Sequence, residues 1–308
     1  MDIIVEDLTK RYDNQKAVDN ISLKVATGEI LGFLGPNGAG KTTTMKIITS
    51  FIAPDEGKVF IGGKLLADNY FELKRHIGYL AENNPLYHEM PVIDFLNFCA
   101  SVQGIEKNRI PVRVAEMIRM TGLKREQYKK IGELSKGYQQ RVGLAQAIIH
   151  DPEILLLDEP TSGLDPNQIV EIRKLIRELG SEKTVILSTH ILPEVEATCD
   201  RILIINKGKI VADGTAESLR NQAQGSDIIK VKIEDGETDR ILKSVKALRS
   251  VSLIELSDPK SNRFDIHFTD NNVKREIFRL CVENKWALTE MTQIETKLED
   301  IFRDLTLN

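Results

Sequence analysis

Short runs of consecutive apolar residues stand out along this chain, and polar or glycine-rich positions bound each of them. The clearest runs fall within residues 29–34, 154–158 and 184–190. Strands that are apolar on both faces are typical of the buried centre of a parallel sheet. Weaker strand patterns occur at 3–10, 21–25, 59–61, 77–80, 201–206 and 209–212. Helical patterns occur at 43–51, 166–180 and 191–198. This alternation predicts an α/β fold, with a polar turn over residues 11–18.

The pattern changes in the middle of the chain, where strand signals stop and helical ones take over. Helices are expected from residue 92 onward, over 112–120 and over 136–149. In the second of these, Val114, Met117 and Ile118 share one face at helical spacing. The sequence therefore predicts a helical subdomain, at about residues 83–150, inserted into the α/β core.

A polar stretch without large apolar residues, 221–227, predicts a linker after a first domain of residues 1–220. Strands are then expected at 228–233, 251–256, 264–268 and 287–294, with helices at 240–248, 273–284 and 297–305. Residues 228–308 thus form a small C-terminal accessory α+β domain in which a ferredoxin-like arrangement is expected.

Composition narrows the class of protein. Apolar residues make up 41% of the chain and charged residues 29%, as in a soluble globular protein. The net charge of −4 gives no general attraction to nucleic acid, and no apolar run reaches the length of a membrane span. Cys99, Cys199 and Cys281 are scattered, which favours reduced thiols in the core. The first residues lack the basic and apolar regions of a signal peptide.

Candidate chemistry begins between the strand at 29–34 and the helix at 43–51. The residues there fit the pattern G-x-x-x-x-G-K-[ST]; they are Gly35, Pro36, Asn37, Gly38, Ala39, Gly40, Lys41 and Thr42. Glycines let successive N–H groups turn inward around phosphate oxygens, and the helix N-terminus adds its positive dipole end. We expect Lys41 to reach the β- and γ-phosphates, Thr42 to bind Mg²⁺ and Thr43 to complete the nucleotide site. A glycine-rich turn with an incidental lysine is the alternative, which the flanking strand and helix disfavour.

Two adjacent carboxylates end the buried strand at 154–158. Open α/β sheets place their ligand crevice at the carboxyl ends of strands, so Asp158 and Glu159 are expected there. Asp158 suits Mg²⁺ through a water, and Glu159 can orient or deprotonate an attacking water. His190 ends a neighbouring strand at the same edge and can contact a γ-phosphate or the water. The alternatives are an exposed acidic turn and a structural histidine.

A second helix start precedes the acidic strand. Ser135 lies at the start of the helix expected over 136–149, and Gly137 follows two residues on. Such a helix N-terminus can bind an anion, although an ordinary capped helix explains it equally well.

Together and in this order, the motifs resemble those of the ATP-binding subunit of ABC transporters, over about residues 3–219. Individual segments resemble Walker A (35–42), the signature (134–139), Walker B with its catalytic glutamate (154–159) and the D-loop (162–165). His190 resembles the switch histidine. Tyr12 stands where the family stacks an aromatic ring on adenine, with a plain surface tyrosine as the alternative.

The resemblance implies a P-loop NTPase core of the ABC ATPase type that binds ATP and Mg²⁺. It implies a homodimer that closes head to tail over two ATP molecules, in which Ser135 and Gly137 of one chain contact the γ-phosphate held by the other. Asp165 would lie across that interface. Hydrolysis would reopen the dimer and drive a separate transmembrane permease, which places the subunit at the cytoplasmic face of the membrane. Residues 83–98 are the expected docking surface.

Two positions depart from the family pattern. Glu82 stands where glutamine is usual, in the loop that senses Mg²⁺; its carboxylate can still accept from a metal-bound water but adds negative charge. Tyr138 replaces the usual glutamine of the signature. Both variants, and the segment 298–302, are similar to the drug- and polysaccharide-export branch. Residues 77–87 resemble most the gliding-motility-associated ABC ATPase.

Other classes fit less well. A GTPase would carry Asn-Lys-x-Asp, whereas residues 206–209 end in lysine. Long heptad segments, typical of DNA-repair and chromosome ATPases, do not occur in the sequence. A non-enzymatic binding module would lack a base such as Glu159. A soluble ABC-type ATPase that acts on ribosomes or DNA stays open as the alternative to export.

Overall fold

The structure, a computed structural model, describes residues 1–223, 227–258, 262–268, 270, 272–294 and 298–307. The described chain divides into two compact units: Met1–Ala216 with Leu305–Asn308, and Glu217–Asp304. The limit between them falls within helix α8 (Ala216–Ala223), whose last turn takes up residues 221–223 of the predicted linker. A helix end can consist of small and polar residues alone. The composition of residues 221–223 therefore does not distinguish a helix end from a linker.

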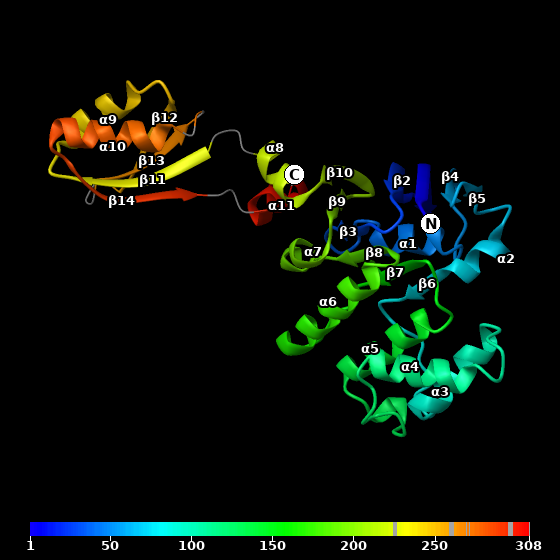
Figure 1. The fold of residues 1–308 in the computed structure, drawn as a ribbon. Coiled ribbons are helices and arrows are strands. Elements are labelled where there is room, and N and C mark those ends of the chain that lie inside the picture. The colour runs from blue at the N-terminus through cyan, green and yellow to red at the C-terminus, as the bar shows by residue number, and fades with distance from the viewer. Residues whose placement is uncertain (224–226, 259–261, 269, 271, 295–297, 308) are drawn as a thin grey trace. The chain divides into compact units, whose positions relative to one another are not determined.

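A six-stranded sheet forms the centre of the first unit (Figure 1). In spatial order its strands are β10 (Lys209–Gly214), β9 (Arg201–Asn206), β3 (Ile30–Leu34), β8 (Thr184–Thr189), β7 (Ile154–Asp158) and β6 (Ile77–Leu80). All neighbours run parallel except β10 and β9, which form a hairpin. The carboxyl ends of β3, β7 and β8 therefore meet at one edge, as the sequence predicted for the α/β core.

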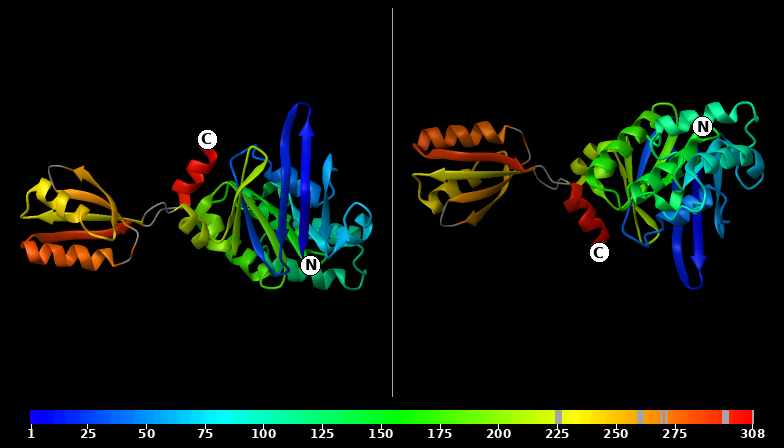
Figure 2. Two further views of the ribbon diagram at one scale, coloured as in Figure 1. Left: turned by 90° about the horizontal axis from the view of Figure 1, so that it is seen from above. Right: turned by 90° about the horizontal axis from the view of Figure 1, so that it is seen from below.

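The alternation of β7 shows how both faces of this sheet are covered. Leu156 packs into a core shared with helix α1 (Lys41–Ile48) and with a second sheet, β1 (Ile3–Tyr12), β2 (Gln15–Val25), β4 (Glu56–Ile61) and β5 (Lys64–Leu65). Leu157 faces the opposite core, with helices α5 (Lys136–Ile148) and α6 (Pro166–Gly180). Figure 2 shows the long β1–β2 hairpin beside the central sheet. Burial on both faces is what the unbroken apolar run predicted.

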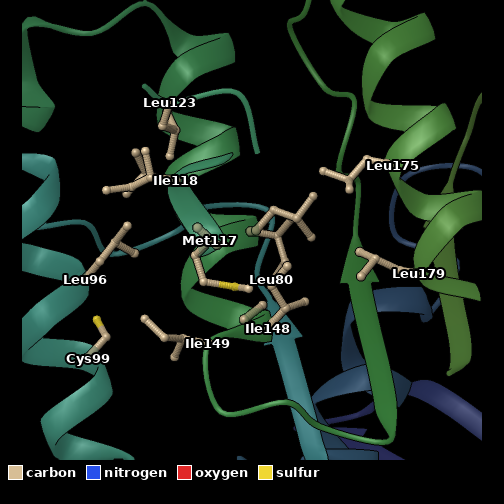
Figure 3. Close-up of a cluster of buried hydrophobic side chains, with 14 of the residues drawn as sticks. Leu80, Leu96, Cys99, Met117, Ile118, Leu123, Ile148, Ile149, Leu175 and Leu179 are labelled. Atoms are coloured by element: carbon tan, nitrogen blue, oxygen red, sulfur yellow. The ribbon is translucent and has the colours of Figure 1, made fainter. Parts of the chain in front are cut away.

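The expected helical subdomain is present as α3 (Val92–Val102), α4 (Ile110–Met120) and α5. Its core joins Leu96 of α3, Met117 of α4 and Ile148 of α5 to Leu80 at the end of β6 (Figure 3). The subdomain is thus packed continuously onto the edge of the central sheet, next to the segment that follows β6.

The expected turn over residues 11–18 is wrong, because most of it is strand. β1 continues to Tyr12 and β2 begins at Gln15, so that only Asp13 and Asn14 form the turn. This end of the hairpin is largely exposed, and its polar residues therefore lacked a strand pattern. The short helices α2 (Tyr70–Leu73) and α7 (Leu192–Thr198) complete the first unit, together with 3-10 turns at Lys74–His76 and Ile131–Glu133.

The second unit has the order β11 (Asp227–Glu234), α9 (Thr238–Lys246), β12 (Val251–Asp258), β13 (Arg263–Phe268), α10 (Val273–Asn284) and β14 (Ala287–Ile294). Its antiparallel sheet has the spatial order β12-β13-β11-β14. This βαββαβ arrangement is the expected ferredoxin-like one. Its core includes Ile229, Phe264 and Ile277. Helix α11 (Leu298–Leu307) ends the described chain.

No helix in the described ranges combines the length and apolar character that crossing a membrane requires.

Candidate functional site

The predicted phosphate loop connects β3 to α1, so a rigid strand and a helix hold both of its ends. Gly38 and Gly40 have φ of 79° and 111°, a region that disfavours residues with a Cβ. A Cβ on Gly40 would also lie 2.4 Å from the Ala17 carbonyl oxygen. The backbone conformation thus favours glycine at both positions, and the close approach of β2 requires it at Gly40 as well. The loop curls at the amino end of α1.

Lys41 is buried, with 6% of its surface exposed, and its ammonium group points back into the loop. Its Nζ donates to the carbonyl oxygens of Gly35 (2.7 Å) and Pro36 (3.2 Å) and lies 3.6 Å from Oε1 of Glu159. These carbonyl contacts hold the cation at a position where the oxygens of a triphosphate could replace them. This geometry suits a lysine that moves onto phosphate oxygens.

Asp158 and Glu159 end β7, both are buried, and the neighbouring strand β8 orients them. Ser188 of β8 donates its hydroxyl to Oδ1 of Asp158. The Glu159 N–H donates to the Ser188 carbonyl oxygen (3.1 Å), and the Ser188 hydroxyl also accepts from it (3.2 Å). Glu159 has φ of 50°, a conformation that costs about 1–3 kcal/mol for a residue other than glycine. Such strain is typical of functional positions, and here it turns the Glu159 carboxylate toward the phosphate loop.

Glu159 lies between two cationic or potentially cationic groups. One carboxylate oxygen faces Lys41, and the other lies 3.0 Å from Nδ1 of His190, which is half-exposed just after β8. A carboxylate held in this way can accept a proton from a water placed beside it. The three side chains come from three different elements, and the fold brings them together at the predicted edge of the sheet.

A cleft of about 490 Å³ opens over the loop. Its lining consists of Tyr12, Gln15, Ala17, Asn37, Gly38, Ala39, Gly40, Lys41, Thr42, Thr43, Glu82 and Glu159. Tyr12 is half-exposed at its rim, where a planar base could stack on its ring. The size and lining suit a nucleotide whose phosphates enter the loop.

The residues expected to hold Mg²⁺ have suitable chemistry. The hydroxyl of Thr42 and the carboxylates of Asp158 and Glu82 are the hard oxygen ligands that this ion prefers. Oδ2 of Asp158 is fully buried and has no hydrogen-bond partner among the described residues. The hydroxyl of Tyr79 is likewise buried without a described partner, and burial, together with the charges of Asp158 and Glu82, raises the pKa of Tyr79 above its usual range. Buried acceptors without partners are what a bound cation and its waters would satisfy.

The signature residues lie elsewhere in the same chain. Ser135 is the exposed N-cap residue of α5, and its side chain makes no capping hydrogen bond to the helix. Gly137 is buried under Gln168, whose Oε1 would lie 2.3 Å from an added Cβ. Neither residue lines the cleft. Asp165 caps α6 by accepting from the Gln168 N–H at 3.0 Å. Within one chain the signature residues therefore do not line the cleft over the phosphate loop, and the contact expected for them is with the loop of a second copy.

Three residues of the site were missed in the sequence analysis. Gln15 and Ala17 were assigned to a turn but line the cleft from β2. Ser188 contacts the carboxylate of Asp158 and the backbone N–H of Glu159. A signal for it was present, because Ser188 is a polar residue that follows three apolar ones near the carboxyl end of its strand.

Comparison with known proteins gives a consistent result. The family model described as ABC transporter matches residues 18–162, and the one described as ATP-binding protein DrrA1-3-like, C-terminal domain, matches residues 214–306. The bacitracin transport ATP-binding protein BcrA of Bacillus licheniformis is 34% identical over 96% of this chain and 94% of its own length. The linearmycin resistance ATP-binding protein LnrL of Bacillus subtilis is 34% identical over 98% and 97%. A solved dimer of the ATP-binding cassette MJ0796, in a post-hydrolysis state with ADP and Pi, is 26% identical with a TM-score of 0.64 and covers 69% of this chain and 98% of that one.

Proposed function

The chain belongs to the ABC transporter ATP-binding protein family, and we propose that two copies of it close over ATP and Mg²⁺ to power export through a separate transmembrane permease. The observation that carries this proposal is the contact of Glu159 with both Lys41 and His190 beside an intact phosphate loop. A binding module without catalysis would not need a buried carboxylate between two such groups.

We assign each side chain a step in the reaction. Lys41 leaves the loop carbonyls for the β- and γ-phosphate oxygens, and Tyr12 stacks on the adenine. Thr42, Asp158 and Glu82 would hold Mg²⁺, which would supply positive charge to the phosphates. Glu159 takes a proton as the water oxygen bonds to the γ-phosphorus and the bond to the bridging oxygen breaks, releasing ADP and phosphate.

A second copy of the chain supplies what the single chain leaves apart. Ser135 presents a hydroxyl that makes no capping bond, at the N-terminus of a 13-residue helix, where donors and dipole favour an anion. The small residue Gly137 lets that helix end approach closely. We assign both to the γ-phosphate held by the partner's loop, which makes dimerisation depend on ATP. The dimeric state of the MJ0796 cassette supports this arrangement.

Export is supported by the two full-length relatives, whose names refer to bacitracin transport and to linearmycin resistance. The permease would dock on the segment 83–98, on the cytoplasmic face of the membrane. Tyr87 and Phe98 support that surface: they are 52% and 43% exposed, and their rings lie 5.7 Å apart. Exposed aromatic pairs are typical of interface anchors. The link to gliding motility stays a prediction from residues 77–87.

The substitution Glu159→Gln tests the assignment most directly. It keeps size and polarity but removes the base, so we expect ATP binding to persist, turnover to fall by about 100-fold or more, and an ATP-bound dimer to accumulate. Size-exclusion chromatography with light scattering, with and without ATP, measures the dimer. Glu182→Gln, an exposed position after α6, is the control and should hydrolyse ATP normally. A Glu159→Gln protein that stays monomeric and hydrolyses ATP would contradict the proposal.

The same trapped variant separates export from the soluble alternative. With ATP, it should co-purify with a multi-span membrane protein from solubilised membranes of its own host. Recovery of ribosomes or DNA in place of a membrane protein would favour the soluble ATPase.

A further inference from the structure

Glu194 on helix α7 is a carboxylate that the proposed reaction does not use, yet it is among the most buried charged groups of the first unit, with 1% of its surface exposed. Burying a carboxylate is costly unless hydrogen bonds and opposite charge compensate it. Both of its oxygens accept from buried hydroxyls: Oε1 from Thr161 at 2.6 Å and Oε2 from Thr189 at 2.8 Å. Arg173 of α6 lies 4.0 Å from Oε1.

The two hydroxyls belong to the segments that carry the catalytic pair. Thr189 directly precedes His190, and its hydroxyl also accepts from the N–H of Ile191 at 3.0 Å, so the backbone is held on both sides of the histidine. Thr161 lies two residues after Glu159, in the turn that leads to the D-loop. The carboxylate of Glu194 therefore connects the two chain segments that carry Glu159 and His190, whose side chains lie 3.0 Å apart.

The backbone conformation of Glu159 indicates why these hydrogen bonds matter for function. Its positive φ persists only if the surrounding structure fixes it. Bonds to Ser188 fix its amino side, and the bond from Thr161 to Glu194 fixes the turn that follows. Catalytic geometry must hold to a fraction of an ångström, which needs supporting hydrogen bonds of this kind.

We propose that Glu194 is a positioning residue for hydrolysis, which holds Glu159 and His190 in register through Thr161 and Thr189. Its hydrogen bonds go to Thr161 and Thr189, and it does not line the cleft. Its loss should therefore slow the chemical step while leaving ATP binding intact. The inference rests on the proposed roles of Glu159 and His190.

A merely structural ion pair between α6 and α7 would behave differently. In that case Arg173 would matter as much as Glu194, and activity would fall only as folded protein is lost. The positioning role depends instead on the two hydroxyl bonds. Glutamine can keep both of them, because its oxygen can accept from one hydroxyl and its N–H can donate to the other.

The experiment compares Glu194→Ala, Glu194→Gln and Arg173→Met for kcat, ATP affinity and melting temperature. We expect Glu194→Ala to lower kcat by about 10–100-fold with ATP affinity within about twofold of the parent. Glu194→Gln should recover most of the rate, and Arg173→Met should keep kcat whatever its melting temperature. A parallel loss of binding and rate in Glu194→Ala, or an equal kcat loss in Arg173→Met, would overturn the proposal.

If Glu194→Ala fails to fold, a comparison of Thr189→Val with Thr189→Ser tests the positioning role instead. Valine removes the hydroxyl at nearly constant shape, whereas serine keeps it. The proposal requires a slower valine variant with normal ATP affinity, and equal rates would refute it. Glu159→Gln distinguishes failure of the proposed function from failure of the positioning role. If Glu159→Gln hydrolyses ATP normally, the proposed function is wrong. If Glu159→Gln is inactive but Glu194→Ala hydrolyses ATP normally, only the positioning role of Glu194 is wrong.

Discussion

The phosphate loop and the signature segment of this chain differ in how far one copy already satisfies their polar groups. At the loop, Lys41 has two carbonyl partners and lies 3.6 Å from Glu159, whose other carboxylate oxygen lies 3.0 Å from His190. At the signature, Ser135 is exposed and its side chain makes no capping bond. The loop is organised before any ligand arrives, while the helix start at Ser135 presents donors outward.

This difference explains why neither region is a complete site. The loop half holds Lys41 and Glu159, and residues of one chain line its cleft. At the signature half, the helix end at Ser135 has N–H donors of the kind that can bind an anion, and neither Ser135 nor Gly137 lines the cleft. An ATP molecule bound in the loop of one copy would supply an anion for the signature helix end of the other copy. The nucleotide would then hold the two copies together.

The largest effect should come from removing the cation of the loop half. Lys41→Ala leaves the buried phosphate position without its positive charge, and we expect ATP affinity to fall by about 100-fold or more. Fluorescent-nucleotide titration measures it. Lys46→Ala, in the last turn of the same helix, is the matched control and should bind normally. Unchanged affinity in Lys41→Ala would show that residues 35–42 do not grip the phosphates.

The second prediction tests whether the two halves meet between copies. Ser135→Arg should block the signature helix end without unfolding it, because Ser135 is exposed and forms no capping bond. Lys41→Ala and Ser135→Arg proteins should each be inactive. A mixed dimer collects both defects in one site and leaves the other intact, so an equal mixture should recover about a quarter of the parent rate.

Mixing is informative because a site built within one chain gives the opposite result. If Ser135 served its own loop, each variant would carry one defect per site and no mixture could recover activity. A double variant, with Lys41→Ala and Ser135→Arg in one chain, is the control when mixed with the parent protein: each site of the mixed dimer then carries one defect, so the mixed dimer should be inactive. Absence of recovery in the first mixture would exclude the head-to-tail arrangement.

The sequence was most informative where chemistry and pattern coincide within a short stretch. The buried run at 154–158 was predicted because both of its faces are apolar, and residues 35–42 were recognisable because every fixed position of the motif is present. The ferredoxin-like order of the second unit could also be predicted, since its strands and helices alternate at ordinary spacing.

The features that could not be predicted depend on contacts between segments that are distant in the sequence. Gln15 and Ala17 reach the cleft because the exposed end of a hairpin continues as strand, for which polar residues give no periodic signal. Glu194 meets Thr161 across 33 positions, and only the packing of α7 behind β8 brings them together. The distance between Glu159 and His190 is likewise a product of strand order, so their roles could be expected but their contact could not.

The smallest effect belongs to Glu82, the departure from the family pattern, and it concerns the loop half alone. Glu82 is exposed and lines the cleft, so its charge acts through solvent and is partly screened. Glu82→Gln removes repulsion toward the triphosphate but also weakens the hold on Mg²⁺. We expect the Mg²⁺ concentration for half-maximal ATPase rate to rise about 2–5-fold, and ATP affinity without Mg²⁺ to rise by a similar factor. Titrations of rate and of binding separate these opposite changes, with Glu182→Gln as a neutralised surface control. If both titrations match the parent protein, Glu82 is not at the metal, and the ion would rest on Thr42 and Asp158 within the loop half itself.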